Sequence, residues 1–356
     1  EKDGQEKASV FASDVFFIML YGLGVISIAV IAAMPWVLYV VAPGFVGDEI
    51  RYDLAVELSR ITFPYLLFMS LTALLGGVLN AVNRFAPFAF APVLFNICLI
   101  AALLLNGLFE SAGHALAWGV LIAGVVQFIW LLVSAARAGI RIQIKKPQFS
   151  VKVKQVFKLM GPGVIGAGVM HINLFADVII ASFLGTGAIS YLYYADRLNQ
   201  LPLGIVGIAV GTALLPMLSR AVAAKKGEEA NDLFNRALEY CFFFGLPASF
   251  ALMAFGNVII AGLFERGAFD VADTVYTANV LSMYAIGLSA YITVKVFSTV
   301  HWAHQDTTTP VKISIIATVL NIALSLVFIQ FMGVAGIALG AGLTGWLHVV
   351  LHWRAQ

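Results

Sequence analysis

The sequence predicts an all-α polytopic membrane protein with about ten transmembrane helices, arranged as two repeated lobes around a central cavity. Composition is the first reason: 61% of the residues are hydrophobic and only 11% are charged, whereas a soluble domain has about 25% charged residues. Such a chain cannot cover a water-facing surface, so most of its surroundings must be lipid. The second reason is a series of long apolar segments, and the third is a weak internal repeat.

Ten apolar segments are long enough to cross a bilayer, which takes roughly 20 residues. In chain order they are 11–42, 56–81, 88–108, 114–137, 157–184, 189–218, 234–256, 273–300, 310–331 and 334–353. The first segment is too long for a single straight span. We expect Pro35 to kink it, or residues 35–43 to lie at the membrane interface.

Lysine and arginine gather on one side of the predicted membrane. Alternate connections, counted from the N-terminal loop, hold 16 of the 21 basic residues, and the opposite connections hold three, Arg51, Arg60 and Arg266. Cytoplasmic loops of membrane proteins carry such an excess of positive charge. We therefore expect both ends of this chain to lie in the cytoplasm.

Two polar stretches lie outside the apolar segments. Residues 1–7 are interpreted as a polar loop without the features of a signal peptide, and a membrane protein that starts in such a loop suggests a truncated chain. Residues 139–156 form a long polar connection in which lysines alternate with apolar residues. We interpret it as a cytoplasmic linker, either solvated with an interfacial strand or helix, or serving as a hinge whose lysines contact anionic lipid, and both can hold.

The internal repeat relates the two halves of the chain. At a shift of about 222 residues Asp48 falls on Asp270, and the turn at 83–87 falls on the turn at 305–310. Repeated lobes around a cavity are the usual frame for alternating access. We expect a first lobe of four helices (1–138), a cytoplasmic linker (139–156) and a second lobe of six helices (157–356), with two helices of the first lobe preceding residue 1.

The most informative segment is 191–202, because it places Asp196 and Arg197 inside a predicted span. Charges at that depth are costly unless they face water or a partner. Arginine can hold a phosphate through two parallel hydrogen bonds and stays protonated. We predict that Arg197 faces a cavity and binds an anion, with Asp196 orienting or releasing it. The alternative is an ion pair that holds two helices together.

Three further residues are weaker candidates for substrate contacts or for a gate. Lys295 is a second cation within a span, near enough to the cytoplasmic end for its amine to reach the interface instead. Arg84 either caps its helix or forms a cytoplasmic gate with Asp306, which lies at the equivalent turn of the other lobe.

A carboxylate in the fifth segment is a candidate for coupling transport to an ion. Asp177 has no basic neighbour on its own helix and is costly to hide in a membrane. We predict that it binds Na⁺ or H⁺, and we name Asp306 as a second candidate for this role. The nearby His171 and Asn173 are expected to be satisfied polar groups in a contact between helices.

Short motifs run through nearly the whole chain in a constant order. They are 61–65 (ITFPY), 83–85 (NRF), 89–92 (AFAP), 193–198 (YYADRL), 202–204 (PLG), 211–216 (GTALLP), 266–269 (RGAF), 305–307 (QDT) and 309–311 (TPV). Together they resemble the MurJ/MviN family of lipid II flippases.

The resemblance implies a fold of the multidrug/oligosaccharidyl-lipid/polysaccharide (MOP) exporter type, similar to MATE transporters, in which this chain would hold the third to the twelfth of fourteen helices. It implies a flippase, not an enzyme, that moves lipid II from the cytoplasmic to the periplasmic leaflet of the bacterial inner membrane by alternating access. Lipid II is the undecaprenyl-diphosphate-linked precursor of peptidoglycan. Asp196 and Arg197 match the family's functional pair. Many members have an acidic residue shortly after that pair, where this chain has Gln200, which puts an acid-coupled role there in doubt.

The expected partners are lipid II, membrane lipids and the cell-wall synthesis machinery, with no nucleic acid. No cofactor or metal site is expected, since no Cys/His cluster, Walker loop, GxSxG or HExxH pattern occurs. The energy source would be Na⁺, H⁺ or the membrane potential.

Two other functions remain as alternatives. Another MOP exporter would carry a lipid-linked polysaccharide, or a drug in exchange for a cation. A drug exporter should line its cavity with acidic residues, and Arg197 argues against it. A membrane enzyme acting on a polyprenyl phosphate would need clustered acids at the cytoplasmic face, where only scattered acids occur.

Overall fold

The computed structural model describes residues 2–140, 142 and 151–355, and every regular element in these ranges is helical. In chain order the elements are α1 (Lys2–Ala32), α2 (Met34–Val41), η1 (Pro43–Phe45), α3 (Glu49–Thr62), α4 (Tyr65–Ala81), α5 (Ala86–Leu104), η2 (Asn106–Leu108), α6 (Ala112–Arg137), α7 (Val151–Ser182), α8 (Ala188–Pro202), η3 (Leu203–Ile208), α9 (Ala209–Ala223), α10 (Gly227–Phe264), α11 (Val271–Ala303), α12 (Thr308–Met332) and α13 (Val334–Ala355). The predicted all-α fold is confirmed.

Nine helical stretches within the described ranges are long and apolar enough to cross a membrane. They correspond to nine of the ten predicted spans. The remaining prediction, 157–184, overlaps α7, in which His171–Ser182 is a shorter apolar stretch, and it extends two residues beyond the end of that helix. The chain is therefore a multi-pass membrane protein, as its composition predicts.

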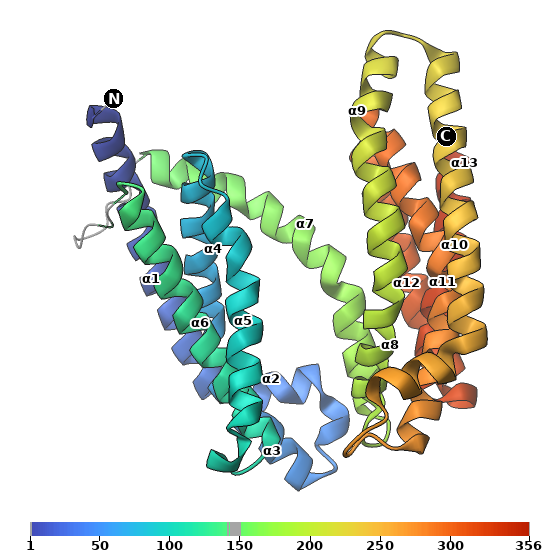
Figure 1. The fold of residues 1–356 in the computed structure, drawn as a ribbon, viewed down its shortest axis with the longest axis horizontal. Coiled ribbons are helices and arrows are strands. Elements are labelled where there is room, and N and C mark those ends of the chain that lie inside the picture. The colour runs from blue at the N-terminus through green and yellow to red at the C-terminus, as the bar shows by residue number, and fades with distance from the viewer. Residues whose placement is uncertain (1, 141, 143–150, 356) are drawn as a thin grey trace. The chain divides into compact units, whose positions relative to one another are not determined.

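The chain forms two compact units, of which the first comprises Glu1–Val41 and Phe45–Ile165. Within it α4 and α5 pack against α6, and α1 packs against α4 (Figure 1). Leucines at the helix contacts are buried: Leu71, Leu75, Leu79 and Leu131 are at most 1% exposed. Many other apolar side chains face outward, which is the arrangement of a helix bundle in lipid.

The second unit comprises Ala42–Gly44 and Gly166–Gln356, and α11 is its central helix. The helices α8, α9, α10 and α13 all pack on α11, and α12 packs on α13 (Figure 1). Small residues let α11 and α13 approach closely, because a Cβ atom on Gly287 would lie 2.5 Å from Cα of Gly342. Helices in membranes associate through such close contacts between backbones.

The predicted repeat is confirmed by the backbone of both units. Asp48 is the N-cap of α3 and Asp270 is the N-cap of α11, and each carboxylate accepts a backbone N–H of the first helical turn. The turns that follow contain left-handed residues at the same spacing, Asn83 with φ 59° and Gln305 with φ 60°. The two capping aspartates are thus 222 residues apart, and so are the two left-handed residues. This is the shift found in the sequence.

The predicted kink near Pro35 is present as a break between α1 and α2 at residue 33. Proline has no N–H, so the carbonyl of Ile31, four residues earlier, loses its helical partner. Nε of Arg60 donates a hydrogen bond to this carbonyl at 3.3 Å. A proline also marks the break between α8 and α9, where Pro202 precedes the π-helical turn 203–208.

One prediction about a helix boundary is wrong. The polar stretch 2–7 continues α1 instead of forming a loop, because its Glu, Gln and Lys residues are good helix formers. The first helix of the second half begins at Val151, so the last part of the linker 139–156 is helical, which is one of the two forms expected there. Residues 141 and 143–150 of that linker, with Lys145 and Lys146, lie outside the described residues.

Candidate functional site

A cavity of about 480 Å³ lies in the second unit, and we call it the polar cavity after the polar side chains among its lining residues. Five helices and the π-helical turn line it with Asn173, Leu174, Asp177, Val178, Ile189, Leu192, Tyr193, Asp196, Asn199, Gln200, Leu203, Gly204, Tyr284, Tyr291, Lys295, Asn321 and Ala341. Its volume is within the range of about 300–1,000 Å³ typical of small-molecule sites. Since most of the lining helices are membrane spans, these polar groups are placed at a high cost, which indicates a functional site.

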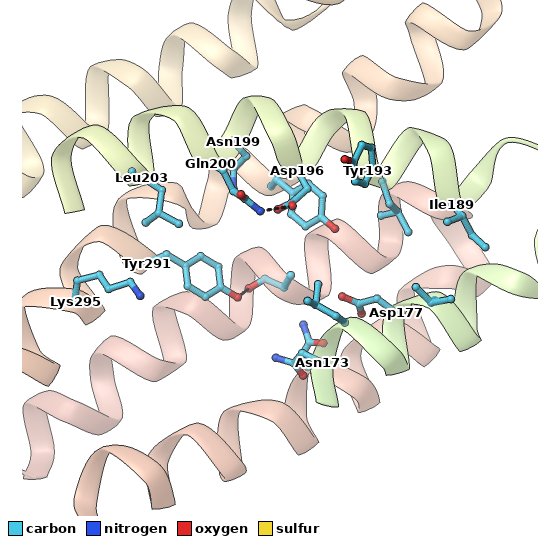
Figure 2. A pocket seen from close by; sticks show the side chains of 17 residues that line it. Asn173, Asp177, Ile189, Tyr193, Asp196, Asn199, Gln200, Leu203, Tyr291 and Lys295 are labelled. Atoms are coloured by element: carbon cyan, nitrogen blue, oxygen red, sulfur yellow. Dashed lines mark hydrogen bonds between the residues drawn. The ribbon is translucent and has the colours of Figure 1, made fainter. Parts of the chain in front are cut away.

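Asp177 and Asp196 both line this cavity, one from α7 and the other from α8 (Figure 2). The side-chain amide of Gln200 donates a hydrogen bond to Oδ2 of Asp196, one helical turn away. Oδ1 of Asp177 is buried and has no hydrogen-bond partner. The cavity therefore contains one carboxylate held by a neighbour and one whose buried oxygen is unsatisfied.

Three asparagines share the situation of Asp177. The Oδ1 atoms of Asn173, Asn199 and Asn321 are buried without a hydrogen-bond partner, and all three residues line the same cavity. Asn173 is thus not the satisfied polar residue of a helix contact that was predicted for it, and His171 is exposed. Buried oxygens of this kind usually have a partner, and amide and carboxylate oxygens are the ligand type that hard cations prefer.

Lys295 reaches the cavity from α11, whereas Arg197 is not among its lining residues. Neighbouring positions on α8 can both line this cavity, as Asn199 and Gln200 do, but the side chain of Arg197 is exposed and does not line it. The guanidinium of Arg197 lies 4.9 Å from the ring centre of Tyr193, whose side chain lines the cavity. Among the described carboxylates none forms an ion pair with Arg197, so the helix-pinning alternative has no support here.

Arg84 lies in the first unit, at a smaller cavity of about 250 Å³ that Trp130 and Arg137 also line. Its backbone N–H bonds to the carbonyl of Leu79 after the left-handed Asn83, so the residue terminates α4. This arrangement fits the helix-capping interpretation.

Asp306 lies in the turn before α12, away from the polar cavity. Its Oδ1 accepts the backbone N–H groups of Thr308 and Thr309, each at 3.0 Å, and its Oδ2 is 3.3 Å from Nδ1 of His301. Hydrogen bonds from Thr309 lower the pKa of Asp306 to about 2. A carboxylate that stays ionised at every physiological pH is a poor proton carrier, and this geometry favours a helix cap.

The sequence is similar to one family along its entire length. The family model described as "Lipid II flippase MurJ" matches residues 1–356. The chain is 38% identical over 355 residues to a probable lipid II flippase MurJ of Rhizobium tropici, covering 98% of this chain and 66% of that protein. It is 35% identical over 355 residues to the lipid II flippase MurJ of Burkholderia cenocepacia, covering 98% of this chain and 69% of the relative.

The chain belongs to the MurJ family of lipid II flippases. Solved structures agree with this assignment: a lipid II flippase MurJ in an inward closed conformation has a TM-score of 0.85 and 28% identity, covering 98% of this chain and 73% of that one. A MATE multidrug transporter of the MOP superfamily has a TM-score of 0.81 at 14% identity, covering 99% of this chain and 80% of that one, and this likeness concerns the fold alone. The chain spans 66% of the length of the MurJ proteins of Rhizobium tropici and Rhizobium meliloti.

Several residues that line the cavity in this MurJ family member are not predicted from the sequence. Asn199 lies three residues after Asp196, so it shares the same helix face, and Asn321 is an isolated amide in an apolar span. Both could have been found by treating every intramembrane amide as a candidate. Tyr284 and Tyr291 carried no such signal, because aromatic residues are common in apolar helices.

Proposed function

We propose that this protein carries lipid II from the cytoplasmic to the periplasmic leaflet of the bacterial inner membrane by alternating access. The observation that carries the proposal is the identity of 38% over 98% of the chain with a relative named as a probable lipid II flippase. The proposal includes both chain ends in the cytoplasm, no covalent catalysis, and cell-wall synthesis proteins as partners. The charge distribution supports the orientation, since 16 of the 21 basic residues lie on one side.

Cationic side chains would hold the diphosphate of the substrate. Lys295 supports this idea because it lines a cavity that also presents amides and tyrosine hydroxyls, groups suited to a sugar–phosphate head. Arg197 lies one residue beyond Asp196 and stacks on the cavity-lining Tyr193. A change of side-chain rotamer would redirect its guanidinium, and Asp196 would guide it. Arg84 remains a weaker proposal for a contact with the head group.

The cavity would also hold the ion that energises transport, with Asp177 as its charged ligand. The four unsatisfied oxygens of Asn173, Asp177, Asn199 and Asn321 support this assignment. Sodium would be bound by these oxygens directly, whereas a proton would neutralise Asp177 alone. Asp306 is the weaker proposal for this role, because its carboxylate already caps α12.

One observation favours the rival function of drug export in exchange for a cation. Two acidic residues, Asp177 and Asp196, line the cavity, and Arg197 does not. We nevertheless prefer lipid II, because the chain is 38% identical to a MurJ protein but only 14% identical to the MATE transporter that shares its fold. In this proposal the carboxylates serve the coupling ion and the arginine, not a cationic drug.

Binding of lipid II by the intact protein tests the proposal. Native mass spectrometry in detergent should show one lipid II retained by the wild type, and no comparable retention of a neutral lipid or a cationic drug. Arg197→Ala should weaken this binding more than Arg197→Lys, which keeps the charge but loses the planar fork. Arg220→Ala, at the end of α9, is a matched control that should bind as the wild type does.

The same variants can be tested in a strain depleted of its own flippase. Arg197→Ala should fail to restore growth, Arg197→Lys should restore it in part, and Arg220→Ala should restore it. Normal growth on Arg197→Ala would remove Arg197 from the proposed site. Equal binding of lipid II and the cationic drug would refute the substrate assignment itself.

A further inference from the structure

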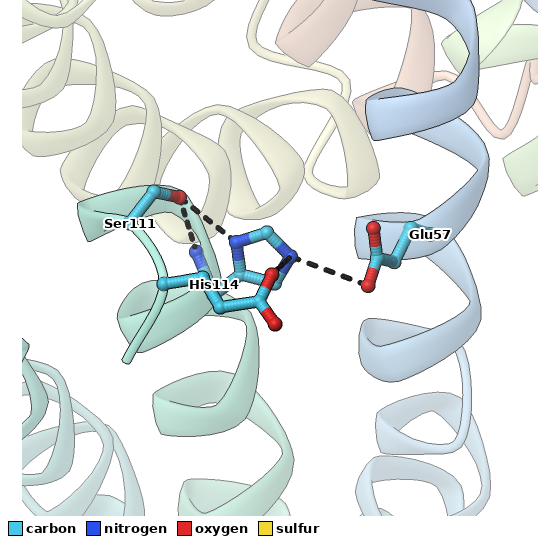
Figure 3. Close-up of polar contacts among 4 residues, drawn as sticks. Glu57, Ser111 and His114 are labelled. Carbon is cyan, nitrogen blue, oxygen red and sulfur yellow. Dashed lines mark hydrogen bonds and ion pairs between the residues drawn. The ribbon is translucent and has the colours of Figure 1, made fainter. Parts of the chain in front are cut away.

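A histidine and two glutamates converge in the first unit, far from the polar cavity in sequence. Nε2 of His114 lies 3.4 Å from Oε1 of Glu57 and 3.8 Å from Oε2 of Glu110 (Figure 3). Glu57 belongs to α3, His114 to the first turn of α6, and Glu110 to the connection just before α6. One ligand atom from each residue lies within 4.8 Å of the other two.

The imidazole of His114 is built into this position. Its side chain is 10% exposed. Ser111, the N-cap of α6, accepts the backbone N–H of His114, and its hydroxyl lies 2.9 Å from Nδ1 of the ring. On the other side of the ring Nε2 is buried and has no hydrogen-bond partner. The serine therefore fixes the ring while Nε2 points between two carboxylates.

The distances from Nε2 of His114 to the two carboxylates indicate what kind of species fits between them. A charge-assisted N–H···O bond is about 2.7–2.9 Å long, and both contacts of Nε2 exceed this length. Two ligands at about 2.1 Å from a tetrahedral zinc ion are about 3.4 Å apart. The separation of 3.4 Å between Nε2 and Glu57 matches two ligands of one ion. Glu110 is 3.8 Å away and 84% exposed, so its side chain is free to complete the set.

The surrounding charges favour a divalent cation. The three residues line a cavity of about 740 Å³ together with Asp53 and Arg60. Its three carboxylates and single guanidinium leave a surplus of two negative charges when His114 is neutral. Arg60 is already engaged, because its Nε donates to the carbonyl of Ile31, and no described ion pair joins it to Glu57 or Glu110.

We propose that Glu57, Glu110 and His114 bind a divalent transition-metal ion, of which Zn²⁺ fits the ligands best. One imidazole nitrogen and two carboxylates supply three of four tetrahedral positions, and the open cavity leaves the fourth to water. The ion ties α3 to the connection between α5 and α6. Glu57 corresponds to Asn279 at a shift of 222 residues, and at shifts of 221 or 222 Glu110 falls on Phe331 or Met332 and His114 on Ala335 or Gly336, so the second lobe lacks this set of ligands.

Zinc binding by the whole protein, purified in detergent without a histidine tag and stripped by a chelator, tests this site. Hydrogen exchange with and without ZnCl₂ localises the ion, since binding should slow exchange in peptides that cover 49–62 and 105–116. Calorimetric titration should give at least a tenfold weaker affinity in Glu57→Gln and Glu110→Gln, and no binding at this site in His114→Gln. MgCl₂ should give no protection at the same concentration, because Mg²⁺ prefers an all-oxygen octahedron.

The controls separate this site from other histidines. Glu49→Gln changes an exposed carboxylate on the same helix that does not line the cavity, and it should bind zinc as the wild type does. The rings of His301, His348 and His352 form a second group on α11 and α13. Protection confined to those helices, or unchanged affinity in Glu110→Gln, would overturn the proposal. Because Glu110 is exposed, that variant should fold even if His114→Gln does not.

Discussion

Replacing Asp177 by asparagine tests its role in ion coupling without disturbing the fold. The carboxylate lines the polar cavity, and its Oδ1 has no hydrogen-bond partner, so the isosteric amide breaks no hydrogen bond that Oδ1 makes in the described structure. Asn keeps one oxygen ligand but removes a full negative charge. We therefore expect a normally folded protein whose response to the coupling ion is weakened or lost.

The expected size of the effect follows from Coulomb's law. A carboxylate about 4 Å from a cation gains about 4 kcal/mol at an effective dielectric constant of about 20. Part of this gain is offset, because the asparagine oxygen still coordinates and a neutral side chain costs less to bury. A net loss of about 1.4–2.8 kcal/mol remains, which corresponds to roughly a tenfold to hundredfold weaker cation affinity.

Two assays measure this change. Thermal unfolding of the full protein at increasing NaCl, with choline chloride at equal ionic strength, reports sodium binding through the rise in melting temperature. Transport of labelled lipid II in vesicles, with Na⁺, pH and membrane potential varied separately, reports coupling. Asp232→Asn, an exposed residue on α10, is the matched control and should behave as the wild type does. If Asp177→Asn keeps the wild-type response to all three variables, Asp177 is structural and the coupling assignment is wrong.

Three further substitutions test other parts of the structure. Gly287→Ala places a Cβ atom 2.5 Å from Gly342, so overpacking should lower the unfolding free energy by about 1–3 kcal/mol in a denaturation assay. Gly262 has open space around it, so Gly262→Ala should not reduce stability in the same assay. Lys295→Gln should weaken lipid II binding in native mass spectrometry without changing the sodium response, and unchanged binding would mean that its amine only reaches the interface. Asp306→Ala should lower the melting temperature at pH 7, because two N–H groups of α12 lose their acceptor. The pKa of Asp306 is lowered from 3.8 to about 2, so the difference from wild type should persist above pH 4 and shrink as the pH falls towards 2.

The repeat could be predicted because it depends on local signals. Asp48 and Asp270 cap helices through their own side chains, and Asn83 and Gln305 occupy equivalent left-handed turns. Such features are encoded within a few residues, so a constant offset in the sequence becomes a constant offset in the fold. The exact helix ends were harder. The start of α7 at Val151 depends on how far a helix extends into a polar stretch, and polar residues such as Lys and Gln permit that.

The residues that line the polar cavity were easier to predict than their positions relative to one another. Asp177, Asp196 and Lys295 stand out in the sequence because ionisable residues are rare within apolar spans. That they share one cavity follows from the packing of α7, α8 and α11, which no local pattern encodes. The placement of Arg197 shows the limit clearly: whether this long, exposed side chain lines the cavity depends on its rotamer, which no local sequence pattern encodes.

The two lobes have equivalent helix caps and turns, but their polar side chains differ. The repeat therefore predicts features of the fold and does not predict the binding sites. Capping aspartates and left-handed turns recur at the same offset, because each lobe must end and restart its helices at the same places. The side chains that these helices carry are free to differ. The helix that carries His114 matches α13 at a shift of 221 or 222 residues, so Ala335 or Gly336 takes the place of the histidine. Ala335 is buried, and a Cβ atom on Gly336 would lie 2.5 Å from the backbone of Phe328 in α12. The close packing of α12 and α13 in the second lobe therefore leaves no room for the imidazole that the first lobe places beside its two glutamates.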